Sequence, residues 1–177
     1  MLKKIALGVV ALIVVIVGYA AIQPAEYEIS RETTINAPAA KVFPYLNNSK
    51  LADQWGPWKE VDPAAKMGFS GPDAGVGSKT SWESDKQLGT GSATIVESVE
   101  NERVGIQIEY TKPMPMTQDS LYLVKANGNQ SVVTWKVTGR NNVVGRVMCL
   151  FMNMDKTVGG MFEKGLSNLK TLVESAP

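Results

Sequence analysis

The chain has 177 residues, with 18 lysines and arginines against 17 aspartates and glutamates, one cysteine and no histidine. Histidine is the usual general base and a common zinc ligand, so its absence excludes Ser-His-Asp triads, Cys-His dyads and HExxH zinc sites. A single cysteine, Cys149, excludes internal disulfides and CxxC redox pairs. We therefore expect neither a metal nor another cofactor.

An uncharged run from Ile5 to Ile22 follows Lys3 and Lys4 at the start of the chain. As a helix it would be roughly 27 Å long, close to the thickness of about 30 Å of a bilayer core. The run predicts a retained membrane anchor, with a cleaved signal peptide and a buried soluble helix as alternatives. The lysines before it and Glu26 after it predict a cytoplasmic N-terminus and an extracytoplasmic domain, periplasmic in a Gram-negative bacterium.

The anchor is expected to occupy residues 1–24, and residues 25–177 should form one domain because no repeat, charge run or low-complexity linker divides them. Without Lys3 and Lys4 the 18 basic residues fall to 16, against 17 acidic residues. Such a nearly neutral domain lacks the positive surface of a nucleic-acid binder. We therefore expect no nucleic-acid partner.

Strand patterns separated by glycine, proline and asparagine make up most of this domain. In residues 27–35 apolar and polar side chains alternate, which is typical of a half-buried strand. Asn127-Gly128 predicts a tight hairpin, and therefore two antiparallel neighbours. The seven predicted strands cover residues 27–35, 66–70, 76–83, 91–99, 103–111, 120–126 and 131–138.

A short helix is predicted directly after the first strand. Asn36 can cap it and Pro38 suits its first position, while apolar side chains then recur at helical spacing. Pro44 removes a backbone hydrogen bond inside this helix. We therefore expect a bend, or an end near Asn47.

A long apolar helical pattern closes the chain. Apolar side chains recur at spacings of three and four from Phe151 to Val173, and they need an apolar partner. One apolar face of the strands supplies it, which predicts an α+β domain with about seven antiparallel strands curved around a long C-terminal helix. For Gly159-Gly160 in the middle of this helix, we expect close approach to a strand, with room for a ligand or a helix break as alternatives.

Several local motifs accompany this order of elements. They are Ile35-Asn36-Ala37-Pro38, Val42-Phe43, Trp55-Gly56-Pro57-Trp58, Phe69-Ser70-Gly71-Pro72, Gly75-Val76-Gly77-Ser78 before Trp82, and Gly165-Leu166 with Leu169-Lys170. With them the chain after Pro24 resembles the helix-grip superfamily (SRPBCC) of birch pollen allergens, START domains and polyketide cyclases. More narrowly, it resembles the polyketide cyclase/dehydrase and lipid transport group. The resemblance implies a deep apolar cavity between sheet and helix.

Candidates for the wall of such a cavity lie at inward strand positions, near the first helix and on the apolar face of the last helix. They are Trp55, Phe69, Trp82, Ile106, Ile108, Tyr110, Trp135, Met154, Asp155, Val158, Met161 and Phe162. The alternatives are ordinary core packing for the tryptophans, gap-filling for the methionines, and for Asp155 a place in the first turn of a helix capped by Asn153.

The preferred functional hypothesis is membrane-anchored binding or transport of a lipid or another small hydrophobic ligand, with the membrane contacted through residues 5–22. The first alternative is a polyketide cyclase or dehydratase-like enzyme, in which Asp155, Glu97 or Tyr110 moves protons. The second is a protein-interaction module without a ligand. The sequence assigns no catalytic residue.

Overall fold

The computed structural model describes residues 2–86 and 88–176. Its elements follow the predicted order of one apolar helix, a strand, short helices, six strands and a C-terminal helical region. In chain order they are α1 (Leu2–Ile22), β1 (Glu26–Ile35), α2 (Ala39–Leu46), α3 (Ser49–Trp55), α4 (Trp58–Val61), β2 (Lys66–Ser70), β3 (Lys79–Glu83), β4 (Thr90–Val99), β5 (Arg103–Lys112), β6 (Met116–Asn127), β7 (Gln130–Arg140), α5 (Val143–Phe151) and α6 (Met154–Ser175).

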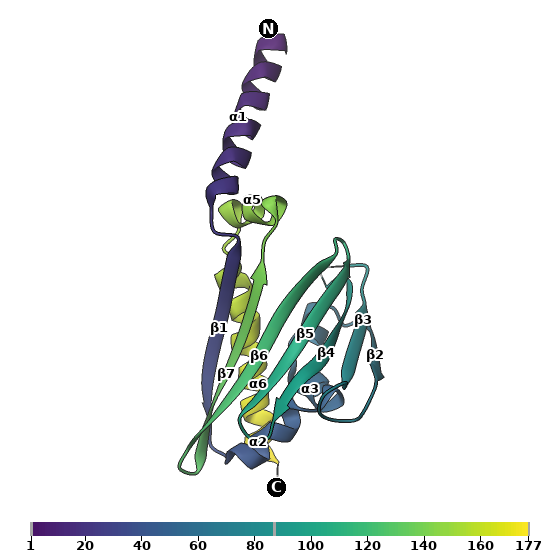
Figure 1. Cartoon of the computed structure of the whole chain (residues 1–177). Helices are drawn as coiled ribbons and strands as arrows, with labels where there is room; N and C mark the ends of the chain where they lie inside the picture. Colours follow the sequence, from purple (N-terminus) through teal and green to yellow (C-terminus); the bar gives the residue numbers. More distant parts are fainter. Residues whose placement is uncertain (1, 87, 177) are drawn as a thin grey trace.

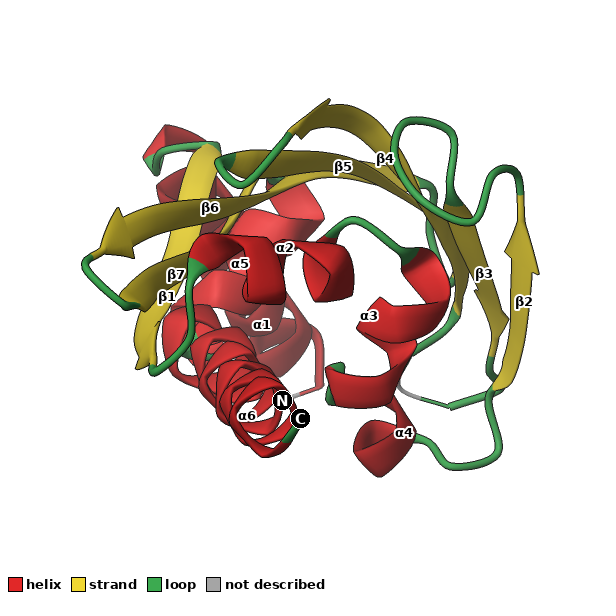
Figure 2. Cartoon of the chain, turned by 90° about the horizontal axis from the view of Figure 1, so that it is seen from below, coloured by secondary structure: helices red, strands yellow, loops and turns green. Residues whose placement is uncertain are grey.

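All seven strands form one antiparallel sheet in the order β1-β7-β6-β5-β4-β3-β2. The sheet curves over α6, which packs mainly against β1, while α2, α3 and α4 complete the covered side (Figures 1 and 2). This arrangement confirms the predicted α+β helix-grip architecture. The tight connection between β6 and β7 is also confirmed, but Asn127 pairs with Gln130, so the turn is Gly128-Asn129, one residue later than predicted.

Two prolines lie at the start and in the interior of α2, the helix predicted after the first strand. α2 starts after Pro38, which has extended backbone angles and gives no side-chain cap, so the expected capping by Asn36 is wrong. Pro44 lies inside α2, and the helix ends at Leu46 with Asn47 as its C-cap. The predicted end near Asn47 is therefore confirmed.

Glu97 does not point inward as its position in an alternating strand predicted. The pairing of β4 with β5 has a register shift between Ile95 and Glu97, which inserts an extra residue and changes the side on which later side chains lie. Ile95 is buried, whereas Glu97 is exposed and its carboxylate accepts a hydrogen bond of 2.7 Å from Arg103. The inward prediction for Glu97 is wrong because the strand is not regular.

The C-terminal region is two helices rather than one continuous stripe. The break falls at Met152 and Asn153, where the Asn153 side chain accepts a hydrogen bond from the backbone N–H of Lys156 and caps α6. Phe151 therefore belongs to α5 and is 73% exposed instead of facing the sheet. α5 lies across the end of the sheet, next to α1 (Figure 1).

Gly159 lets α6 approach β1 closely. A Cβ atom at Gly159 would overlap the guanidinium group of Arg31, which extends from β1 to the helix. The Arg31 side chain donates hydrogen bonds of 2.7 Å to Glu163 and 2.9 Å to Asp155. The close approach predicted for the glycine pair is thus confirmed at Gly159, while a Cβ atom at Gly160 would meet only open space.

The two glycines give a matched stability test. Gly160→Ala should stabilise the domain by about 1 kcal/mol, because alanine has the higher helix propensity and its methyl group is free of contacts. Gly159→Ala should gain less or lose stability, because its methyl group displaces Arg31 from Asp155 and Glu163. Urea unfolding of both variants measures the difference, and equal gains would contradict the close contact.

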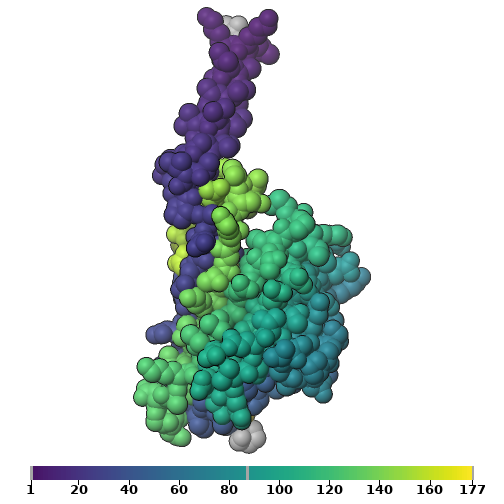
Figure 3. All heavy atoms as spheres, in the orientation of Figure 1, coloured from purple at the N-terminus to yellow at the C-terminus, as the bar shows by residue number. Residues whose placement is uncertain are grey.

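α1 extends away from the domain and is long and apolar enough to be a membrane span or a signal sequence (Figures 1 and 3). Nearly all of its described side chains are exposed, and Ala20, near its end, is buried. A soluble core helix would be mostly buried, so the alternative of a buried soluble helix finds no support in this arrangement.

Candidate functional site: an apolar cavity

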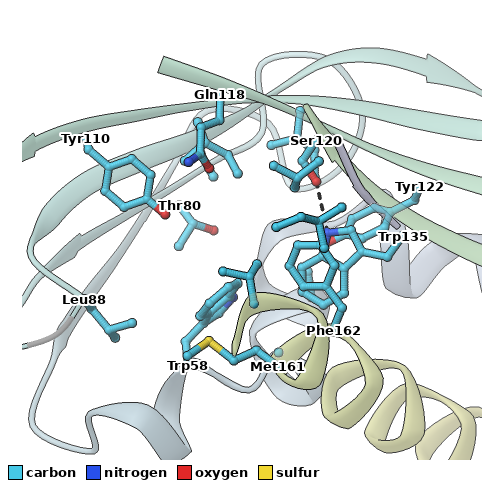
Figure 4. Close-up of a pocket in the computed structure, with 18 of the residues that line it drawn as sticks. Trp58, Thr80, Leu88, Tyr110, Gln118, Ser120, Tyr122, Trp135, Met161 and Phe162 are labelled. Carbon is cyan, nitrogen blue, oxygen red and sulfur yellow. Dashed lines mark hydrogen bonds between the residues drawn. The ribbon is translucent and has the colours of Figure 1, made fainter. Parts of the chain in front are cut away.

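A cavity of about 540 Å³ lies between the inner face of the sheet, α3 and α6. Its volume is within the range of about 300–1,000 Å³ that is typical of sites for small molecules. Residues of β1 to β7 supply one wall, and residues of α3, α4 and α6 supply most of the other (Figure 4). The curvature of the sheet over the helices creates this space.

Eleven of the twelve candidates named from the sequence line this cavity. They are Trp55, Trp82, Ile106, Ile108, Tyr110, Trp135, Met154, Asp155, Val158, Met161 and Phe162. The exception is Phe69, which is 39% exposed and borders a small recess of about 50 Å³ beside Ser49 and Lys50. Phe69 shares the inward side of β2 with Met67, which does line the cavity, but it lies past the point where the start of α3 closes the space.

Several lining residues were missing from the candidates. The alternation of Gln118, Ser120 and Tyr122 on β6 could have revealed all three, but the predicted strand began only at Ser120. Asp53 lies on α3, where tertiary packing alone determines which side chains reach the cavity. The remaining residues that were missed include Tyr27, Trp58, Met67, Thr80, Leu88 and Met116.

Four aromatic rings close one end of the cavity. The Trp135 ring stacks on Phe162 with centroids 4.1 Å apart, and makes edge contacts with Trp55 and Tyr122 at 5.5 and 5.4 Å. Both buried indoles have hydrogen-bond acceptors, because Trp135 Nε1 donates to Ser120 Oγ at 3.1 Å and Trp55 Nε1 donates to the Tyr45 carbonyl at 2.9 Å. Trp55 is fully buried, in agreement with core packing. This cluster forms a rigid apolar end.

Beyond that end the interior is filled. Val124, Val133, Leu169 and Val173 are all buried in the same core cluster. The cavity therefore extends from the four rings in the other direction, toward the ends of β5 and β6 that lie near α5 (Figure 1).

Uncharged polar groups lie on the sheet wall, away from the four rings. Figure 4 shows Tyr110, Thr80 and Gln118 extending into the space from β5, β3 and β6. Burial raises the pKa of Tyr110 above its ordinary value of 10, so the phenol stays protonated at neutral pH and can donate a hydrogen bond. The Tyr110 ring packs edge-on against Trp82, whose Nε1 donates to the Leu88 carbonyl at 3.1 Å. These groups suit a neutral polar part of a ligand.

The carboxylates at the cavity differ in their surroundings. Asp155 lies at the rim with an exposed side chain, and hydrogen bonds from Arg31 lower its pKa, which is the opposite of what a buried general base requires. Asp53 is mostly buried, with Oδ2 at 2.6 Å from Lys59 Nζ and with Oδ1 lacking a hydrogen-bond partner among the described residues. Within residues 2–86 and 88–176, no group of three or more Cys, Asp or Glu side chains could hold a metal ion.

Solved structures of known proteins share this fold. The truncated norcoclaurine synthase of Thalictrum flavum matches with a TM-score of 0.63 and 14% identity, over 88% of this chain and 98% of that one. Ara h 8.0201 matches with a TM-score of 0.55 and 14% identity, over 85% and 99%. The di-domain ARO/CYC BexL of the BE-7585A biosynthetic pathway matches with a TM-score of 0.60 and 15% identity, over 89% and 53%. Identities this low show the fold alone.

A comparison with curated proteins gives no match. The family model for polyketide cyclase / dehydrase and lipid transport, in contrast, matches residues 26–174, from the start of β1 to the last turns of α6. That match covers most of the chain and all of the elements that form the cavity. The chain belongs to the polyketide cyclase / dehydrase and lipid transport family.

Proposed function

We propose that this protein binds a lipid or another small hydrophobic molecule in the cavity while α1 anchors it in a membrane. The single observation that carries this proposal is the cavity of about 540 Å³, which has an aromatic end and walls of mostly apolar side chains. The family to which the chain belongs includes lipid transport in its description, which supports the same conclusion.

The lining indicates the chemical class of the ligand. No lysine or arginine lines the cavity in the described part of the chain, so an anionic group inside it would find no positive partner. Tyr110, Thr80 and Gln118 offer neutral hydrogen bonds. The lining therefore disfavours an anionic group inside the cavity, and it suits an uncharged molecule with one or two polar groups, or a lipid whose anionic headgroup stays outside.

The cavity also argues for binding rather than proton-transfer chemistry. Asp155 is exposed and ion-paired, and Glu97 faces solvent on the other side of the sheet. Tyr110 is neutral at physiological pH, and burial raises its pKa further above the ordinary value of 10, which makes it a hydrogen-bond donor rather than a base. The three side chains considered for a cyclase-like mechanism therefore lack the environment of a general base.

The charges on either side of the apolar run favour a binding domain outside the cytoplasm. Lys3 and Lys4 precede the apolar run and Glu26 follows it, which favours a cytoplasmic N-terminus. The anchor would keep the domain beside a bilayer, where hydrophobic ligands are concentrated. Protease treatment of whole cells and of opened cells tests the orientation, and digestion of the domain in inside-out vesicles alone would contradict it.

Ligand binding should be visible in the purified protein. We expect native mass spectrometry of the full chain in detergent to show a bound hydrophobic molecule. A matching ligand from a lipid panel should raise the midpoint of thermal unfolding by about 5–10 °C at a free concentration of about 100 times Kd. The control is a variant in which a larger side chain fills the cavity. This variant should lose a ligand of the cavity but keep any molecule that binds only around α1. Neither a bound molecule nor any stabilisation would contradict the proposal.

A further inference from the structure

α5 is a helix without a role in the core. Its nine residues are all described, and none of them is buried. Instead it carries exposed apolar side chains near both of its ends, and these extend to the residue after it. They are Val143, Val144, Met148, Leu150, Phe151 and Met152. A soluble domain of this size rarely exposes so many large apolar side chains on one segment, so this surface needs a partner.

α5 is attached to the end of the apolar helix α1. The Arg146 side chain of α5 donates hydrogen bonds of 2.8 Å to the Ala21 carbonyl and 3.1 Å to the Gln23 carbonyl, the last carbonyls of the apolar helix and its exit. Ala20 of α1 is fully buried at the same junction. α5 therefore has a fixed position at the last turn of α1 and lies across its end (Figure 1).

If α1 spans a bilayer, α5 lies at the level of the membrane interface. The apolar run ends at Ile22, so the carbonyls held by Arg146 lie where the hydrocarbon core gives way to the headgroups. An amphipathic helix held at that level lies in the plane of the interface with its apolar side chains in the acyl region. The membrane that holds α1 is thus the partner that the exposed side chains of α5 fit.

The cavity opens at the same end of the domain. Cys149 of α5 is exposed and lines the cavity. Asn141 before α5 and Met154 after it also line the cavity. Met116 at the start of β6 also lines the cavity and is exposed. The rim of the opening therefore carries apolar side chains from two segments that are far apart in the sequence.

From these observations, and resting on the membrane anchoring proposed above, we propose that α5 lies in the membrane interface and forms one side of a ligand portal that opens onto the bilayer. A hydrophobic molecule then passes between the acyl region and the cavity without crossing water. Tyr110, which pairs with Met116 at the opening, and Gln118 receive the neutral polar end of a molecule that enters with its apolar end first.

The lone cysteine gives a direct test. Cys149 is the only cysteine of the chain, so an environment-sensitive fluorophore can be attached at the portal of the otherwise unaltered full-length protein. The labelled protein is reconstituted into phosphatidylcholine vesicles containing lipids brominated near the top of the acyl chains. We expect bromine to remove about half of the emission, because an interfacial helix inserts about 5–10 Å into this region, and aqueous iodide to quench only weakly.

A label at the other end of the domain is the matched control. Asn129→Cys combined with Cys149→Ser places the fluorophore on the exposed turn between β6 and β7, far from α1 (Figure 1). That label should respond to iodide and not to brominated lipid. Val144→Asp combined with Phe151→Asp should reverse the behaviour of the Cys149 label, because a charged α5 leaves the acyl region.

Flotation of the vesicles separates the two proposals. Protein that floats with the vesicles, while its Cys149 label is quenched by iodide and not by brominated lipid, would keep the anchor and overturn the portal. Protein that does not float would overturn the membrane anchor and the portal together. Quenching by brominated lipid that persists in the double aspartate variant would also overturn the role assigned to the apolar side chains of α5.

Discussion

Replacing Ile108 by tryptophan should abolish ligand binding while leaving the domain folded. Ile108 lies on the inner face at the middle of β5, opposite Ala93 of β4 and Gln118 of β6, and all three line the cavity. An indole at this position projects into empty space rather than into a packed core, so the usual cost of overpacking, about 1–3 kcal/mol, should largely be avoided. The space that a ligand needs would be occupied.

The expected result is the loss of the stabilisation by ligand, about 2.7 kcal/mol at a free concentration of about 100 times Kd in the unmodified protein. Gln107→Trp is the matched control, because neighbouring residues of a strand face opposite sides and Gln107 is exposed. Thermal unfolding with and without ligand measures both variants. Full ligand stabilisation in folded Ile108→Trp protein would show that the ligand binds elsewhere.

Phe162→Ala should produce the largest loss of stability of any change considered. Phe162 is 2% exposed, stacks on Trp135 at 4.1 Å and lies at the point where α6 meets the closed end of the cavity. Removing a buried phenylalanine ring costs about 3–5 kcal/mol, because the apolar contacts are lost and a void remains. Here the void joins the existing cavity, so the surrounding side chains can relax little into it and the loss of stability is not offset.

Phe151→Ala provides the comparison, because the same substitution at a side chain that is 73% exposed should change the free energy of unfolding by less than about 0.5 kcal/mol in detergent. Urea titrations followed by tryptophan fluorescence measure both values. Similar costs for Phe162 and Phe151 would contradict the buried stack. A larger cavity in Phe162→Ala should also shift ligand preference toward bulkier molecules.

The fold was predictable because it depends on periodicity, which is a local property of the sequence. Alternating patterns located the strands, and the helical stripe located α6 and the face that it buries. The same parity placed Ile106, Ile108 and Tyr110 on the wall that lines the cavity. Whether such residues fill a core or border a space depends on the curvature of the sheet, which no local pattern contains.

The predictions that were wrong for single residues have definite physical causes. The register shift after Ile95 reversed the side on which Glu97 lies, and bulges of this kind leave no clear mark in composition. Phe69 has the expected parity, but it lies beyond the point where α3 closes the cavity. The cap by Asn153, considered as an alternative for Asp155, is confirmed, but the apolar residues of α5 fit a helical pattern that continues into α6, so the separate helix α5 was not predicted.

The cluster of Trp55, Tyr122, Trp135 and Phe162 determines how a ligand could move through the domain. Its rings close one end of the cavity, and the buried aliphatic side chains beyond them leave no continuing path. If the cavity holds a ligand as proposed, the ligand does not pass through this end, so the domain stores its ligand and does not conduct it from one side to the other. Net movement of ligand between two places would then require the loaded domain to meet a second acceptor at its opening, and the direction of transfer would follow the relative affinities of the donor and the acceptor.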